Sequence, residues 1–283
     1  MTQDQAFKLF NQMIDEASKE LFEFTLSTKL SIEKKADKTS VTECDQSIDR
    51  KLSDIARNNG LQVVSEEGEH VIDIVKSGNY ITIDPIDGTL GYIEYVNYAL
   101  ERNGINTFGH INLGAQSDFC LLLGIVENNI PAYAAVYNYI TKEKILINAN
   151  TSYIFRENNI RNYNSKFCFY MDQREGGELE RYVKEMPEVT SVIQAALGLK
   201  SIYTIINPHE AAVTIHRVQS AGLWDIMPAA VAARAFNASV LDDNGNDLEF
   251  NKYIILPGKG STIIKGNKFQ FVREELKKVP NIL

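Results

Sequence analysis

The sequence predicts a mixed α and β protein, with enough residues, 283, to bury a large core. Two observations lead to this class. The first half opens with an amphipathic helical pattern and continues into apolar runs separated by turn residues, which indicates an antiparallel sheet. The second half alternates strand-like runs with helical patterns. A polar stretch from Asn148 to Asn164 separates the halves, so we predict an N-terminal α+β unit over residues 1–155 and a C-terminal α/β unit over residues 156–283.

Two helices are expected near the N-terminus. The first runs from about Asp4 to Leu30, where apolar residues recur at three- and four-residue steps and form a stripe that faces the core. The stripe consists of Phe7, Phe10, Met13, Ile14, Ala17, Leu21 and Phe24. The second runs from Asp45 to about Asn59, because Gly60 offers a favourable C-terminal cap.

Strands follow in short apolar runs. Leu61–Ser65 is one, and Ile81–Ile83 ends another. Phe119–Val126 and Ala132–Tyr139 form a hairpin around the turn Asn128-Asn129. The remaining strands are expected at Lys144–Asn148, Lys166–Met171 and Ser201–Ile206, and the remaining helices at Leu179–Glu185, Pro228–Phe236 and Lys268–Lys278.

The segment Tyr95–Gln116 is rich in Asn, Gly and Tyr and shows little periodic pattern. A long loop of this kind in a compact domain is usually functional or disordered. We expect either a loop that contacts substrate or a second subunit, or a surface loop without a role, and the sequence leaves both open.

The composition argues against several classes of function. A formal net charge of −8 disfavours binding to a nucleic acid polymer, because no basic excess displaces phosphate counterions. No run approaches the roughly 20 apolar residues of a membrane span, and the N-terminus lacks the pattern of a signal peptide. Three scattered cysteines without a C-x-x-C pair favour reduced thiols. We therefore expect a cytoplasmic protein that binds no membrane.

The chemistry concentrates in Asp84-Pro85-Ile86-Asp87-Gly88-Thr89, directly after a β-branched run. A tight turn can aim two carboxylates three residues apart at one point, and Pro85 stiffens that turn. Gly88 lets the backbone approach a ligand, and Thr89 adds a hydroxyl beside backbone N–H groups. Hard oxygen ligands next to N–H donors suit Mg²⁺ and a phosphate together. The pattern indicates a metal-dependent phosphatase loop.

This hexapeptide matches D-P-[IL]-D-[GS]-[ST], the main motif of the inositol monophosphatase superfamily, and three more blocks follow the family's order. Val63–Gly68 resembles its strand and Glu-Glu pair, and Gly222–Asp225 resembles its W-D element. Val41–Asp45 resembles V-T-x-A-D, with Cys44 at the usual alanine. Together the blocks span about residues 35–240. The resemblance implies a layered α-β-α-β-α sandwich of the inositol monophosphatase and fructose-1,6-bisphosphatase type.

The resemblance also implies a site for two or three Mg²⁺ ions. The first metal would be bound by Glu66, Asp84 and the carbonyl of Ile86, and the second by Asp84, Asp87 and Asp225. Glu67 would stand behind these ligands or bind a third, weaker cation. Such a concentration of carboxylates is costly unless cations neutralise it.

The implied catalytic residues are Asp45, Thr89 and Glu66. Backbone N–H groups of Gly88 and Thr89 would hold the substrate phosphate. Asp45 would hydrogen-bond Thr89, which would orient and help to deprotonate a metal-bound water that attacks phosphorus directly. Met227 and Pro228 stand where the family has small residues, which we expect to alter helix packing but not metal binding.

The substrate is expected to be a small phosphorylated molecule. Leu90-Gly91-Tyr92 after the motif is nearer to 3'(2'),5'-bisphosphate nucleotidases and inositol polyphosphate 1-phosphatases than to the Asn-Phe of inositol monophosphatases. We therefore prefer 3'-phosphoadenosine 5'-phosphate, with inositol phosphates next and fructose 1,6-bisphosphate third. Gly198-Leu199-Lys200 resembles a nucleotidase element whose lysine could bind a second phosphate, but an exposed lysine is the simpler expectation.

The family further implies Mg²⁺ dependence, inhibition by Li⁺ and a frequent tendency to form homodimers. A different class of function is a non-catalytic metal-binding protein on the same fold, because folds outlive functions. Such a protein would not need Asp45 and Thr89, and both are present.

Overall fold

The computed structural model describes residues 1–26, 32–34, 40–101, 118–158, 168–171, 191–194, 196–206, 212–215, 221–241, 247–252, 254 and 262–264. The expected helices Leu179–Glu185 and Lys268–Lys278 lie outside these ranges. Within them, no helix combines the length and the hydropathy needed to cross a membrane.

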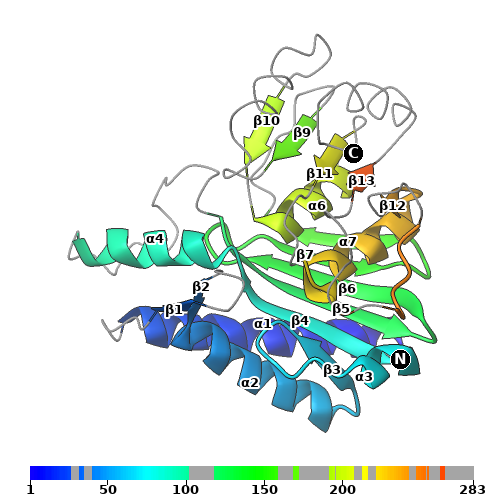
Figure 1. The fold of residues 1–283 in the computed structure, drawn as a ribbon, viewed down its shortest axis with the longest axis horizontal. Helices are drawn as coiled ribbons and strands as arrows, with labels where there is room; N and C mark the ends of the chain where they lie inside the picture. The colour runs from blue at the N-terminus through cyan, green and yellow to red at the C-terminus, as the bar shows by residue number, and fades with distance from the viewer. Residues whose placement is uncertain are drawn as a thin grey trace.

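The described elements stack in four layers (Figure 1). Helices α1 (Gln3–Leu26) and α2 (Glu43–Asn58) cover one face of a six-stranded sheet, and α6 (Leu197–Ile206) and α7 (Leu223–Phe236) cover the other. A five-stranded sheet lies beyond α6 and α7. The described residues thus show the first four layers of the expected α-β-α-β-α sandwich, which confirms the layered fold.

The six-stranded sheet has the order β3-β4-β5-β6-β7-β8. Its strands are β3 (Gln62–Ser65), β4 (Tyr80–Asp87), β5 (Cys120–Glu127), β6 (Ile130–Asn138), β7 (Lys144–Asn148) and β8 (Tyr153–Glu157). Only the pair β3 and β4 is parallel. The predicted hairpin is confirmed, since Asn128 (φ 53°) and Asn129 (φ 64°) both adopt the left-handed conformation that a two-residue turn requires.

The five-stranded sheet has the order β10-β9-β11-β13-β12 and mixes parallel and antiparallel pairs. Its strands are β9 (Cys168–Met171), β10 (Ser191–Gln194), β11 (Ala212–Ile215), β12 (Ser239–Leu241) and β13 (Thr262–Ile264). The remaining elements are the two-stranded sheet of β1 (Ile32–Lys34) and β2 (Ser40–Thr42), and helices α3 (Ile72–Ser77) and α4 (Thr89–Glu101).

The core is continuous across the predicted unit boundary at residue 155, because α6 and α7 pack directly on the six-stranded sheet. A hydrogen bond and an ion pair that share the buried carboxylate of Glu143 reinforce this contact. Glu143, 2% exposed in its side chain, accepts from Tyr203 of α6 at 2.6 Å and pairs with Arg156 of β8. The division into 1–155 and 156–283 stays a prediction.

Two expectations are wrong. Ser201–Ile206 is the end of helix α6 and not a strand, because a helix that is buried all round shows no polar face to reveal its period. Residues 95–101 continue α4 instead of starting a loop, and residues 102–117 lie outside the described ranges. No strand was predicted within the polar stretch 148–164, and the structure adds strand β8 there, whose alternating exposure fits the edge of a sheet.

Candidate metal centre

The two aspartates of the hexapeptide lie on one face of the sheet because β4 is irregular between them. Asp84 pairs with Leu122 of β5 and Asp87 with Cys120, so three steps along β4 match two steps along β5. In a regular strand, residues three apart point to opposite faces. The extra residue of this bulge brings both carboxylates to the face covered by α6 and α7, where Leu122 and Cys120 also pack.

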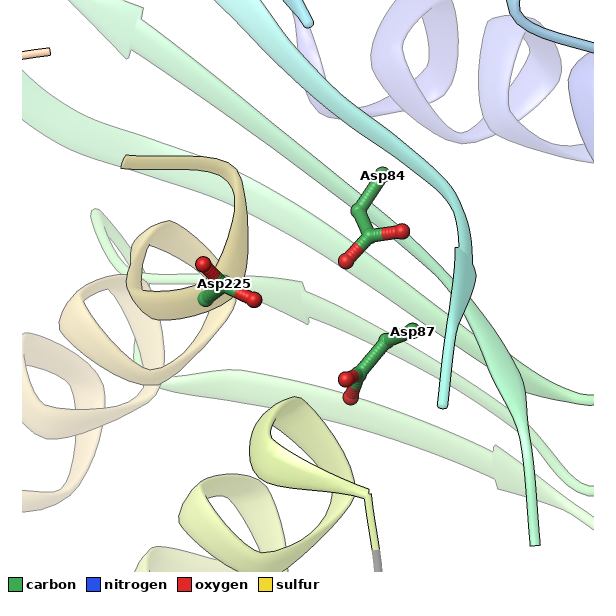
Figure 2. Close-up of side chains that lie close together, drawn as sticks. All are labelled: Asp84, Asp87 and Asp225. Atoms are coloured by element: carbon green, nitrogen blue, oxygen red, sulfur yellow. The ribbon is translucent and has the colours of Figure 1, made fainter. Parts of the chain in front are cut away.

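The first turn of α7 brings a third carboxylate to the same place. Oxygens of Asp84, Asp87 and Asp225 lie within 4.8 Å of one another, and Figure 2 shows the three side chains converging from β4 and α7. Asp225 stands at the third position of the helix, where its Oδ2 accepts from the Gly222 N–H at 2.6 Å. A carboxylate is favourable at this end of a helix. Helix α7 thus begins five residues before the predicted start at Pro228.

Glu66, in the bend after β3, belongs to the same group. Its charge raises the pKa of both Asp84 and Asp45. Burial is the main cause of the raised pKa of Asp84, followed by repulsion from Glu66, Asp87 and Asp225. Glu67 is half-buried beside Glu66.

Asp87 is held by helix α6, a contact that sequence reasoning missed. Its Oδ2 accepts from the Gly198 backbone N–H at 2.6 Å and from the Cys120 thiol at 3.6 Å. Burial raises the pKa of Asp87 to about 6, and the Gly198 bond and the Lys200 charge oppose this rise.

Lys200 is therefore part of this region. It is fully buried on α6, so the expectation of an exposed lysine is wrong. The sequence signal that could have placed this lysine near the site was the triplet Gly198-Leu199-Lys200. Lysine is almost never fully buried unless paired, and here the carboxylate of Asp87 is close enough for its pKa to be lowered by the lysine charge.

Thr89, the first residue of α4, connects the carboxylate cluster to α2. Its Oγ1 is 3.1 Å from Asp45 Oδ1 and 3.2 Å from the Ile86 carbonyl oxygen, and it can donate to either. The other oxygen of Asp45 accepts from the N–H of Thr42 at 2.9 Å, in a capping box that starts α2 two residues before the predicted Asp45. Burial raises the pKa of Asp45 to about 6.

Gly88 occupies a position that only glycine fits. Its φ is +91°, and a Cβ there would lie 3.0 Å from both the Ala196 Cβ and the Asp118 carbonyl oxygen. Its carbonyl accepts from the Gly91 and Tyr92 N–H groups of α4. The backbone N–H groups of Gly88 and Thr89 thus stand at the start of a helix, a position suited to a phosphate.

These residues fit divalent cations. Asp84 is 1% exposed and its Oδ2 has no hydrogen-bond partner, although a buried polar atom normally has one. Several carboxylates close together in a buried place are costly without cations, and hard oxygen ligands suit divalent cations such as Mg²⁺, Ca²⁺ and Mn²⁺. The fold and the site together define a metal-dependent hydrolase of phosphate esters.

The model of the Inositol monophosphatase family matches residues 3–268, and the chain therefore belongs to this family. It is an enzyme of the phosphoric monoester hydrolase class, with Mg²⁺ as the family's cofactor. A search of curated proteins finds no matching relative.

Solved structures share the fold at low identity. An IMPase/NADP phosphatase complexed with Mg²⁺ and phosphate is 17% identical with a TM-score of 0.70, covering 99% of this chain and 98% of the other. The extragenic suppressor protein suhB from Bartonella henselae is 16% identical with a TM-score of 0.66, covering 96% and 97%. Staphylococcal inositol monophosphatase-1, soaked in LiCl, is 17% identical with a TM-score of 0.71, covering 99% and 97%.

Proposed function

We propose that the chain hydrolyses a small phosphomonoester at the centre formed by β4, α2, α4 and α7. Glu66, Asp84 and the Ile86 carbonyl would hold one Mg²⁺, and Asp84, Asp87 and Asp225 the other. Glu67 would stand behind them or bind a third ion. The convergence of three carboxylates within 4.8 Å, with Asp84 Oδ2 left unpartnered, carries this proposal. Bound Mg²⁺ supplies Lewis acidity and makes a water more acidic.

Thr89 and Asp45 would move the proton. Thr89 can pass its own proton to Asp45 Oδ1, 3.1 Å away, while it accepts one from the attacking water. Asp45 must be ionised to accept it, and a pKa of about 6 leaves it mostly ionised at pH 7. The water oxygen then bonds to phosphorus, the ester P–O bond breaks, and the alcohol leaves with a proton from solvent. N–H groups of Gly88 and Thr89 would hold the phosphate throughout.

The substrate that we prefer is 3'-phosphoadenosine 5'-phosphate. Two observations support it: the sequence Leu90-Gly91-Tyr92 after the motif, and the buried position of Lys200 close to Asp87. A lysine beside the ligand region is suited to a substrate with a second phosphate, because it adds positive charge to the site.

A simple inositol monophosphate or an inositol polyphosphate is the alternative substrate. The favouring observation is that the similar solved structures include a staphylococcal inositol monophosphatase-1 and an IMPase/NADP phosphatase. A non-catalytic metal-binding role is disfavoured by the Thr89–Asp45 hydrogen bond, which metal binding alone does not require.

The test is phosphate release from 3'-phosphoadenosine 5'-phosphate, inositol 1-phosphate, inositol 1,4-bisphosphate and fructose 1,6-bisphosphate. Each is assayed with Mg²⁺, with EDTA, and with Mg²⁺ plus Li⁺. We expect Mg²⁺-dependent, Li⁺-sensitive turnover, fastest for 3'-phosphoadenosine 5'-phosphate. Faster turnover of an inositol phosphate would favour the alternative, and no turnover despite bound Mg²⁺ would favour the non-catalytic role.

Assembly and location follow as secondary proposals. We expect the protein to form a homodimer, as members of the family often do. Light scattering would measure its mass in solution. Reduced thiols fit a cytoplasmic protein, and Cys44 and Cys120 are both free and buried.

A further inference from the structure

Two aromatic rings connect the segments that carry Glu66 and Asp225. The imidazole of His70 stacks on the indole of Trp224, with ring centroids 4.8 Å apart and planes inclined by 31°. His70 is exposed and ends the bend that begins at Glu66, whereas Trp224 is 4% exposed and precedes Asp225 in α7. The stack therefore joins two stretches of chain more than 150 residues apart.

The indole of Trp224 is also fixed against the backbone before α7. A Cβ on Gly222 would lie 2.2 Å from Trp224 Cε2, so the ring occupies the space that any larger residue at 222 would need. The N–H of the same Gly222 donates to Asp225 Oδ2 at 2.6 Å. A shift of the Trp224 indole would therefore displace Gly222, whose N–H orients the Asp225 carboxylate.

Two backbone hydrogen bonds involve the bend itself. Glu66 N–H donates to the Ile83 carbonyl, which anchors the start of the bend to β4, and Val71 N–H donates to the Glu69 carbonyl within the bend. Gly68, Glu69 and His70 are exposed. Among the ring contacts of the described residues, the stack on Trp224 is the one that ties this bend to α7.

We propose that His70 is a positioning residue for the metal centre. By stacking on Trp224 it holds the bend that carries Glu66 against the first turn of α7, and so sets the spacing between carboxylates from the two halves of the chain. The inference rests on the proposed metal roles of Glu66 and Asp225. It assigns His70 no contact with substrate and no proton transfer.

The expected effect follows from the strength of such stacks. An aromatic pair contributes about 0.5–1.5 kcal/mol beyond its buried area, which corresponds to about a 2- to 13-fold change in an equilibrium constant. Replacing His70 by Ala should therefore weaken Mg²⁺ binding about 2- to 13-fold. His70→Phe keeps a flat ring and should restore most of the affinity, and Glu69→Ala alters an exposed neighbour and should change nothing.

The experiment measures Mg²⁺ binding to the full chain without substrate, by titration calorimetry and by fluorescence of Trp224, the single tryptophan of the sequence. Circular dichroism verifies that each variant is folded. Weaker binding in His70→Ala with recovery in His70→Phe supports the proposal. Wild-type affinity in His70→Ala, or no recovery in a folded His70→Phe, overturns it. If the wild-type chain itself binds no Mg²⁺, the proposed metal centre fails instead, which separates the two ideas.

Discussion

Replacing Asp87 by Asn should make the metal-free protein more stable while it removes activity. The carboxylate is 7% exposed and its pKa is raised to about 6 from an ordinary value of 3.8. Above pH 6 the folded protein therefore carries a charge that the unfolded chain accommodates more easily. Asn has the same shape, and its amide oxygen can still accept from the Gly198 N–H.

The magnitude follows from the two pKa values. Their difference corresponds to about 3 kcal/mol at pH 8, a value that already includes the attraction of Lys200. For a chain of 283 residues we expect Asp87→Asn to raise the Tm in EDTA by about 5 °C.

The pH dependence has a definite sign. Between pH 3.8 and about 6 the folded wild-type protein holds a proton on Asp87 that the unfolded chain has released, so its stability falls as the pH rises through this window. The advantage of the Asn variant should therefore shrink to about half at pH 5 and to about a fifth at pH 4.

The assay is calorimetric unfolding of both proteins in EDTA at pH 8 and pH 5, followed by Mg²⁺ titration and phosphate release at pH 8. Asp54→Asn, at an exposed position, is the matched control and should leave the Tm unchanged. The reasoning is refuted if Asp87→Asn is no more stable than wild type in EDTA at pH 8. Full turnover in this variant would refute the metal assignment.

Three further predictions concern neighbouring residues. Thr89→Ala should lower kcat about 10²- to 10⁴-fold with Mg²⁺ affinity unchanged, because the hydroxyl moves a proton; a parallel loss in Mg²⁺ calorimetry would contradict this role. Lys200→Met should raise KM for 3'-phosphoadenosine 5'-phosphate more than for inositol 1-phosphate in steady-state assays, and equal changes would exclude contact with a second phosphate. Gly198→Ala should destabilise the fold by about 1–3 kcal/mol in urea unfolding, since its Cβ would lie 2.2 Å from Leu122 Cδ1; unchanged stability would show that α6 moves freely.

Local patterns predicted the elements whose partners are near in sequence. The turn at Asn128-Asn129 needs only local conformations. Strand β7 pairs with the preceding strand β6, and it was predicted with its observed bounds. Helix α6 was missed because Ile202, Tyr203 and Thr204 have high strand propensity, and its burial on all sides results from two sheets that no local window contains.

The candidate site residues also divide into those predicted from local sequence and those that needed more distant information. The hexapeptide contains its own turn, so Asp84 and Asp87 were found from spacing alone, whereas the family resemblance was needed to add Asp225 and Asp45. Lys200 was placed wrongly because lysine is usually exposed, and the approach of α6 to Asp87, which brings the lysine near a carboxylate, is not visible in the sequence.

Because β4 has an extra residue between Asp84 and Asp87, the facing of the two carboxylates depends more on the length of the hexapeptide than on the identity of its middle residues. A substitution at Pro85 or Ile86 leaves the pairing of Asp84 with Leu122 and of Asp87 with Cys120 intact, and its effect is graded. An insertion or deletion of one residue between the aspartates would send the second carboxylate to the face covered by α1 and α2. Substitutions in this loop can therefore accumulate one at a time, whereas a change of its length by one residue would separate the two carboxylates at once.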